Sequence, residues 1–316
     1  MLVYPYSRIK EKEVMAKVKV RVPASSANMG PGFDSLGLAL SMYNYIEAEE
    51  TANGLQIDIL DAETKEFLPT DEKNLVYKAM RYLYEKAECK MPGLKLTLTN
   101  EVPVTRGLGS SSACIIGGLV AANELCGKKF SSREIMAMAT KLEGHSDNVC
   151  ASYLGGFTVS VFNKDEVFYH SHKIEGNLKC LVLIPDYAVT TQKARNTLPG
   201  YYAKKDVAFN ISHAALLVAS MVSGNYDNLL CAIDDRVHEP YRKVYIDGYQ
   251  KLYNKLKSYG ALGTFISGSG PTLASIVEAD DAEFFYEDIK EYTDKAFPTW
   301  SVKLLDIDNE GAKVIK

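Results

Sequence analysis

The chain has 316 residues, 47% of them hydrophobic, which is enough apolar material for one large core or two smaller ones. The formal net charge of −4 argues against a nucleic-acid or membrane-surface role that rests on bulk charge, and the sequence has no run of about 18 apolar residues that would predict a transmembrane helix. The six cysteines are scattered without a Cys-x-x-Cys pair, so we expect reduced thiols, no disulfide framework and a cytoplasmic protein.

Helices and strands alternate along the chain. Alternating apolar and polar residues predict strands at 16–24, 54–60, 93–103, 155–162, 179–186, 263–279 (around a glycine-rich turn) and 301–308. Periodicity and capping residues predict helices after an N-cap at Asp71, from about Ser111 to Gly127, after a Ser131–Glu134 capping box, and at 213–224, 247–260 and 281–296. This order predicts an α+β protein of two joined lobes, which we place at 1–170 and 171–316. The first 14 residues lack the apolar core of a secretory signal and are expected to be a flexible extension.

The stretch "EVPVTRGLGSSSACIIGGLV", residues 101–120, has the clearest chemistry. A helix N-terminus leaves backbone N–H groups without partners and carries partial positive charge. Gly107 and Gly109 would let an anion approach those donors, and the hydroxyls of Ser110–Ser112 could bind phosphate oxygens or magnesium. The pattern is neither a Walker A loop nor a Rossmann fingerprint. Taken alone, an ordinary glycine turn before a serine-capped helix explains it equally well.

Two further loops change that balance. "PASSANMGPGFDSLGLAL", residues 23–40, offers an amide at Asn28 and a carboxylate at Asp34, and "ISGSGPTLASI", residues 266–276, is a second glycine-serine loop. In this order the three stretches resemble the three motifs of the GHMP kinases, named for galactokinase, homoserine kinase, mevalonate kinase and phosphomevalonate kinase. The second motif, Pro-x-x-x-Gly-Leu-Gly-Ser-Ser, matches Pro103–Ser111, with one departure: a serine follows at 112 where Ala or Gly is usual.

Within this family the sequence looks like the homoserine kinases. The resemblance lies in "PASSANMGPGFDSLG", "LEGHSDNVCASYLGGF" (142–157), "TTQKARNTLP" (190–199) and "HEPYR" (238–242). It implies a two-lobed GHMP kinase fold. The N-terminal, ATP-binding lobe would be ribosomal-protein-like with a left-handed β-α-β crossover, and the C-terminal lobe would be ferredoxin-like.

The resemblance also implies a reaction and its cofactors. ATP and L-homoserine would give ADP and O-phospho-L-homoserine, a step of threonine biosynthesis, with Mg²⁺ as cofactor. The nucleotide would bind at Pro103, Arg106, Gly107, Leu108, Gly109, Ser110, Ser111 and Ser112. Ser111 and Glu143 would hold magnesium, which prefers hard oxygen ligands. Without the adjoining Gly-His-x-Asp-Asn run, Glu143 would be read as a solvated carboxylate at a helix end.

The substrate would be a small zwitterion with a hydroxyl group. Its ammonium needs acceptors, which Asn28 and Asp34 provide, and its carboxylate suits the forked guanidinium of an arginine. Arg195 and Arg242 lie in the matching segments, although isolated arginines are usually surface residues. His145, Thr191 and Gly268 are further substrate contacts by resemblance, and His145 could equally be a buried, hydrogen-bonded histidine.

One position bears on the mechanism. In relatives such as mevalonate kinase an Asp acts as general base, and the matching residue here is Asn148, which cannot take a proton at neutral pH. Phosphoryl transfer has a loose transition state with little need for early deprotonation. We therefore expect direct transfer without a dedicated base, with Asn148 orienting the hydroxyl. A rival hypothesis makes Asp147 the base.

Other functions stay open at this point. The chain could be another small-alcohol kinase, such as a mevalonate-like enzyme, or a nucleotide-binding regulator without turnover. His170-x-His172 could suggest a metal site, but an exposed strand edge explains it better. We expect no nucleic-acid or membrane partner. The sequence leaves feedback inhibition and the oligomeric state open, with a homodimer as one candidate.

Overall fold

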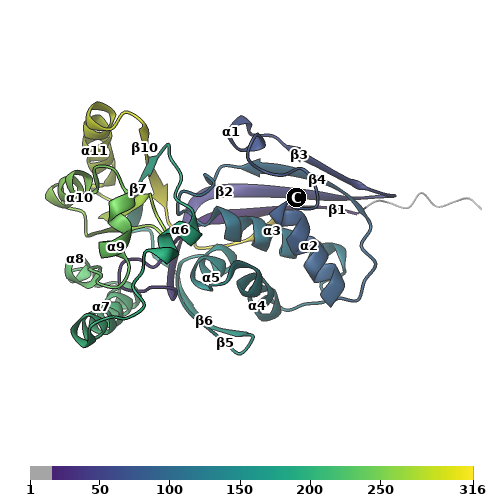
Figure 1. The fold of residues 1–316 in the computed structure, drawn as a ribbon, viewed down its shortest axis with the longest axis horizontal. Coiled ribbons are helices and arrows are strands. Elements are labelled where there is room, and N and C mark those ends of the chain that lie inside the picture. The colour runs from purple at the N-terminus through teal and green to yellow at the C-terminus, as the bar shows by residue number, and fades with distance from the viewer. Residues whose placement is uncertain (1–15, 316) are drawn as a thin grey trace, which may run out of the picture.

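The computed structural model describes residues 16–315, so the expected extension at residues 1–14 lies outside the described residues. Figure 1 shows two lobes side by side, each built around its own sheet. The architecture is mixed α+β, as the sequence predicts.

The N-terminal lobe holds a seven-stranded sheet in the order β11-β1-β2-β4-β3, with β5 paired to β2 and β6 paired to β5. Its strands are β1 (Lys17–Ala27), β2 (Leu36–Thr51), β3 (Leu55–Ile59), β4 (Gly93–Asn100), β5 (Phe157–Asn163), β6 (Glu166–His172) and β11 (Lys313–Ile315). The parallel pair β3 and β4 is joined through α1 (Ala62–Lys65) and α2 (Leu75–Lys86). This is the β-α-β unit that the family resemblance implies.

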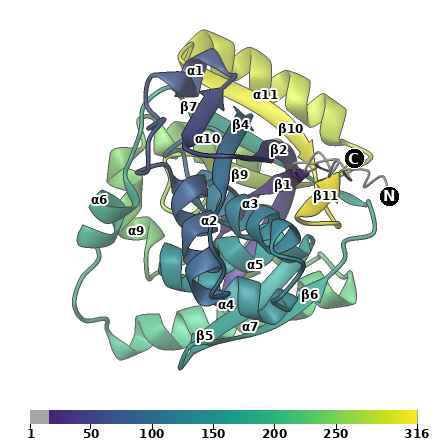
Figure 2. The ribbon, with the colours of Figure 1, turned by 90° about the vertical axis from the view of Figure 1, so that its right-hand side faces the viewer.

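Helices α2, α3 (Ser110–Leu125), α4 (Ser132–Glu143) and α5 (Asp147–Leu154) cover one face of that sheet (Figure 2). The alternating Val and Leu residues of β1 and β4 pack against the apolar stripe of α2, as their periods predict. The Ser131–Glu134 capping box is present at the start of α4. The N-cap of α2 needs a correction: it is Asn74, whose side chain accepts from the Val76 N–H, while Asp71 accepts from the Lys73 N–H in the preceding turn.

The C-terminal lobe holds a four-stranded sheet in the order β10-β7-β9-β8, with every neighbouring pair antiparallel. The strands are β7 (Leu178–Pro185), β8 (Gly263–Ile266), β9 (Leu273–Glu278) and β10 (Trp300–Asp306). Helices α10 (Tyr249–Ser258) and α11 (Ala282–Ala296) pack on one face. This strand order with two helices is the ferredoxin-like arrangement.

Four short or medium helices are inserted between β7 and α10. They are α6 (Thr191–Asn196), α7 (Lys204–Ser223), α8 (Leu229–Ala232) and α9 (Glu239–Arg242), followed by a 3₁₀ turn, η1 (Lys243–Tyr245). The free face of the C-terminal sheet packs on the N-terminal lobe, where Met29, Leu38 and Leu108 share one core with Val182 and Phe265. A continuous core between the lobes fixes the loops that meet at their junction.

The boundary that we place at 170/171 falls inside β6, so the change of sheet comes slightly later, between His172 and Leu178. The last strand also departs from a simple division, because β11 pairs with β1 in the first sheet (Figure 2). The C-terminal segment therefore returns to the N-terminal lobe.

Candidate active site

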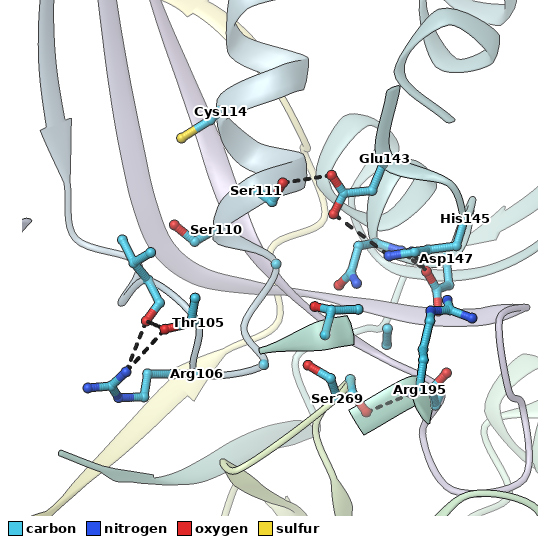
Figure 3. Close-up of a pocket in the computed structure, with 18 of the residues that line it drawn as sticks. Thr105, Arg106, Ser110, Ser111, Cys114, Glu143, His145, Asp147, Arg195 and Ser269 are labelled. Carbon is cyan, nitrogen blue, oxygen red and sulfur yellow. Dashed lines mark hydrogen bonds and ion pairs between the residues drawn. The ribbon is translucent and has the colours of Figure 1, made fainter. Parts of the chain in front are cut away.

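A cavity of about 330 Å³ lies where the two lobes meet, and most of the predicted site residues line it (Figure 3). Its lining comes from the loop after β1, the glycine loop before α3, the α4–α5 junction, α6, α9 and the β8–β9 loop. The predicted residues on it are Asn28, Asp34, Arg106, Gly107, Gly109, Ser110, Ser111, Glu143, His145, Asn148, Thr191, Arg195, Arg242 and Gly268, together with the rival base Asp147. Folding thus gathers segments that are up to 240 positions apart, as in the bond from Asn28 to Gly268.

The glycine loop needs its glycines for two reasons. Gly107 and Gly109 have φ values of 81° and 72°, which favour glycine, and a Cβ on either would collide with a neighbour. That neighbour is the Ser267 carbonyl for Gly107 and the Ser25 hydroxyl for Gly109. Gly109 is the N-cap of α3 and gives no side-chain cap, so the first N–H groups of α3 are left for a ligand.

Ser111 and Glu143 lie next to each other at the N-terminus of α3. The Ser111 hydroxyl donates to Glu143 Oε2 at 2.8 Å, joining the first turn of α3 to the last residue of α4 (Figure 3). The Glu143 side chain is only 10% exposed, so it is not the solvated carboxylate of the alternative reading. A hydroxyl and a carboxylate beside an anion-binding helix terminus are the hard oxygen donors that magnesium prefers, so these residues fit the expected metal.

His145 connects that pair to Asp147. Its Nδ1 lies 2.6 Å from Asp147 Oδ1, and its Nε2 lies 3.8 Å from Glu143 Oε1. Burial lowers the pKa of His145, but the hydrogen bond to Asp147 and the charges of Asp147, Glu143 and Asp34 outweigh it, so the pKa is raised. This histidine is therefore buried and hydrogen-bonded, and it also lines the cavity, so its contact with the substrate stays a prediction.

Two buried serines hold Asn148. Its Oδ1 accepts from Ser25 Oγ at 2.8 Å, and Ser25 Oγ accepts from Ser152 Oγ at 3.0 Å. This bond assigns the side-chain oxygen of Asn148 to Ser25, and Asn148 lines the cavity. Sequence reasoning did not single out Ser25, whose only signal was its place in the first motif.

The same cavity is lined by the residues predicted to bind the charges of the substrate. Asn28 Oδ1 accepts from the Asp34 N–H at 3.0 Å, and Asn28 Nδ2 donates to the Gly268 carbonyl at 2.8 Å. Asn28 therefore ties the first and third motifs together. Arg195 donates two hydrogen bonds to Asp34 in a bidentate ion pair, at 3.0 and 2.7 Å, and this hydrogen bonding to Asp34 is the main cause that raises the pKa of Arg195.

Arg242 is buried below this pair. Its Nη1 donates to the Gly268 carbonyl at 2.9 Å and to His238 Nδ1 at 3.2 Å, and the Phe33 ring lies 5.2 Å from its guanidinium and 5.6 Å from that of Arg195. Burial lowers the pKa of His238 to about 4, so this imidazole is neutral and donates Nε2–H to the Gly30 carbonyl. Phe33 and His238 contact these arginines without lining the cavity, and sequence reasoning did not assign either of them.

Four predicted nucleotide residues lie differently from expectation. The Ser112 hydroxyl is buried away from the cavity and has no hydrogen-bond partner among the described residues, so it does not face a phosphate. The Leu108 side chain belongs to the core between the lobes, and Pro103 does not line the cavity. The Arg106 guanidinium bonds the carbonyls of Pro185 and Asp186, so it attaches the glycine loop to the C-terminal lobe.

No cluster of metal-binding side chains forms around His170 and His172 in the described part of the chain. Both lie on β6, which pairs only with β5 in the described sheet. Strand-edge placement explains the His-x-His spacing.

Two lobes of this topology around an anion-binding helix terminus define a small-molecule kinase of the GHMP type. The chain matches the sequence model of the GHMP kinases N terminal domain over residues 74–156 and that of the GHMP kinases C terminal over residues 214–295. It therefore belongs to the GHMP kinase family.

Relatives of nearly full length place it among the homoserine kinases of that family. Homoserine kinases of Clostridium botulinum and Petrotoga mobilis are 43% and 42% identical, over 95% and 94% of this chain and 99% and 96% of their own length. The crystal structure of homoserine kinase from Cytophaga hutchinsonii superposes with a TM-score of 0.84 at 28% identity, covering 99% of this chain and 100% of that one. A mevalonate kinase structure, at TM-score 0.67 and 14% identity, covering 93% of this chain and 100% of that one, shares the fold.

Proposed function

We propose that the chain transfers the terminal phosphoryl group of ATP to the hydroxyl of L-homoserine, giving ADP and O-phospho-L-homoserine for threonine biosynthesis in the cytoplasm. The observation that carries this proposal is the arrangement along one cavity. The Ser111–Glu143 pair lies at the open N-terminus of α3, and Asn148 and the Asp34–Arg195 pair line the same cavity.

The phosphate end fits ATP. The N–H groups of the first turn of α3 would bind the phosphates, and the Ser111 hydroxyl and Glu143 carboxylate would hold magnesium. When bound, magnesium would neutralise the charge of the transferring phosphate. Leu68, Leu75 and Val104 give the cavity an apolar end, where we place the adenine ring.

Asn148 orients the acceptor in this proposal. With its carbonyl held by Ser25, the side-chain NH₂ donates to the substrate hydroxyl and points an oxygen lone pair at the terminal phosphorus. The new oxygen–phosphorus bond forms as the bond from that phosphorus to the bridging oxygen of ADP breaks. The hydroxyl proton passes late to an oxygen of the transferred phosphoryl group, which then releases it to water. The proposal gives Asp147 a positioning role, because its Oδ1 binds His145 and accepts from the Asn148 N–H.

The charged end fits a zwitterion. Asp34 and Arg195 form an ion pair with each other in this structure. An α-amino acid would offer its ammonium to Asp34 and its carboxylate to Arg195, and Arg242 lines the same cavity. Mevalonate carries a carboxylate but no ammonium, so the Asp34 carboxylate favours an amino acid. The test is ADP release with homoserine, with the product identified by phosphorus NMR. An inactive regulator would release no ADP.

A further inference from the structure

Arg242 is a buried arginine, and no carboxylate of a described residue forms an ion pair with it. It is 3% exposed, whereas the half-buried Arg195 is paired with Asp34. Burial, and then the neighbouring charge of Arg195, lower the pKa of Arg242. Buried charges are normally paired, because their desolvation is costly. An unpaired guanidinium that lines a cavity is therefore suited to an anion that arrives through that cavity.

Two uncharged acceptors hold the guanidinium of Arg242. Its Nη1 donates to the Gly268 carbonyl at 2.9 Å and to His238 Nδ1 at 3.2 Å. Both hydrogens of Nη1 are thereby used, which fixes the plane of the guanidinium. Nη2 makes no hydrogen bond with a described residue, so its donors remain for a ligand in the cavity.

The contacts of His238 determine which of its ring nitrogens carries the hydrogen. Nε2 lies 2.8 Å from the Gly30 carbonyl, which can only accept, so Nε2 must be the donor. Burial lowers the pKa of His238 to about 4, so at neutral pH the ring has a single N–H. Nδ1 is therefore a free acceptor for Arg242. A protonated ring would have a donor at both nitrogens and could not accept from a guanidinium.

The surroundings of His238 leave it little freedom to turn. The residue is 0% exposed, and its ring lies 5.5 Å from that of Phe33. Asp235 Oδ2 accepts from the N–H groups of His238 and Glu239 at 2.7 Å each, at the start of α9, and Asn210 of α7 donates to Asp235 Oδ1 at 2.6 Å. The backbone and the ring of His238 are thus both fixed, and its Nδ1 is an acceptor at a fixed place.

We infer that His238 is a positioning residue that aims the guanidinium of Arg242 at the carboxylate of the substrate and leaves the charge of that arginine unneutralised. A carboxylate in the place of the imidazole would hold Arg242 but would take up its charge before the substrate arrives. The same imidazole binds Gly30 in the loop that carries Asp34, so one side chain sets the places of both charged groups. The inference rests on the proposed function and adds a residue that does not line the cavity.

Two amide substitutions separate the two hydrogen bonds of the imidazole. The amide oxygen of an asparagine can take the place of Nδ1, and the amide NH₂ of a glutamine can take the place of Nε2. His238→Asn should keep the acceptor for Arg242 and a homoserine KM near the wild-type value. His238→Gln should keep the bond to Gly30 and raise the homoserine KM about 10-fold, the lower end for a hydrogen bond to a charged group. The control is His170→Gln, at an exposed site on β6.

The split between kinetic constants distinguishes positioning from a merely structural role. His238→Gln should leave kcat and the KM for ATP unchanged, and it should add no further loss in an Arg242→Ala background. Equal homoserine KM values for His238→Asn and His238→Gln would overturn the inference. So would a loss of kcat or of ATP affinity in His238→Gln, or an undiminished effect of His238→Gln in the Arg242→Ala background.

Nitrogen-15 NMR of the imidazole tests the geometry without turnover. The His238 signals, identified by their loss in His238→Asn, should show an unprotonated Nδ1 and a protonated Nε2 at neutral pH, and the Nδ1 signal should shift in Arg242→Ala. A protonated Nδ1, or an Nδ1 signal that Arg242→Ala leaves in place, would overturn the inference. A wild type that releases no ADP with homoserine would overturn the proposed function, whereas homoserine turnover with equal KM values in the two His238 variants would overturn only the role of His238.

Discussion

The guanidinium of Arg195 and the carboxylate of Asp34 face each other in a bidentate ion pair, with N–O distances of 3.0 and 2.7 Å, although 161 positions separate them in the sequence. Each was predicted to hold one charge of the substrate. In this structure the two side chains neutralise each other, and under the proposed function an amino acid would supply an opposite charge to each.

Arg195→Ala should raise the homoserine KM by about one to two orders of magnitude, corresponding to about 1.5–3 kcal/mol for a hydrogen bond to a charged group. The homoserine KM of Arg195→Lys should lie between those of the wild type and Arg195→Ala. The lysine ammonium keeps the positive charge but cannot form the two parallel hydrogen bonds of a guanidinium. The KM for ATP should stay unchanged, and the exposed Arg81→Ala should alter neither constant. An equal rise in both KM values after Arg195→Ala would remove this arginine from the substrate site.

Ser111→Ala and Glu143→Gln should each lower kcat strongly and shift the magnesium dependence to higher concentration, because each removes one proposed oxygen ligand. Excess magnesium should restore part of the activity. Glu85→Gln, at an exposed carboxylate on α2, serves as the control. If both site variants had the same magnesium dependence of kcat as the wild type, the ion would bind elsewhere.

Asn148→Asp separates orientation from base catalysis. A carboxylate at this position would repel the phosphates and lose the donor that holds the hydroxyl, so kcat should fall. The measurement is kcat as a function of pH, over a range of about 6 to 9 that spans neutral pH. A faster enzyme, or a new pH-dependent limb with higher activity, would show that the reaction wants a base.

Ser25→Ala should lower kcat/KM for homoserine by about 2- to 10-fold, the range for one neutral hydrogen bond, because Asn148 loses the bond that fixes its amide. Ser25 acts as a positioning residue, so the same substitution should have almost no effect in an Asn148→Ala background. Ser275→Ala, which breaks a buried hydroxyl–hydroxyl bond with Thr264 in the other lobe, is the matched control. If Ser25→Ala lowered kcat/KM for homoserine by the same factor in the Asn148→Ala background, Ser25 would not act through Asn148.

The sequence predicts what depends on local periodicity. Spacing predicts eight of the eleven described strands, the longer helices and the Ser131–Glu134 capping box. It does not predict β2, β6 and β11, or the short helices α1, α5, α6, α8 and α9. Asn74 and Asp71 both satisfy the N-cap rule, and only packing decides between them. The three serines of the glycine loop differ by about 100° each around α3. The phase of α3 on the sheet therefore turns Ser111 toward Glu143 and buries Ser112.

Contacts between distant segments escape such reasoning. The hydrogen bond from Ser25 to Asn148 spans 123 positions. The hydrogen bond from Arg242 to Gly268 joins the short helix α9 to the loop between β8 and β9. The resemblance supplies these residues as members of motifs. It does not say that Asp34 and Arg195 bind each other or that Arg106 reaches across to Pro185.

Selection of a hydroxylated amino acid by this cavity can be measured as kcat/KM of the wild-type enzyme, read by ADP release. The substrates are homoserine, threonine, serine, mevalonate and galactose under one set of conditions. Homoserine should have the highest value, and mevalonate and galactose, which lack an ammonium for Asp34, should be poor substrates. A value for mevalonate or galactose equal to or above that for homoserine would contradict this selection.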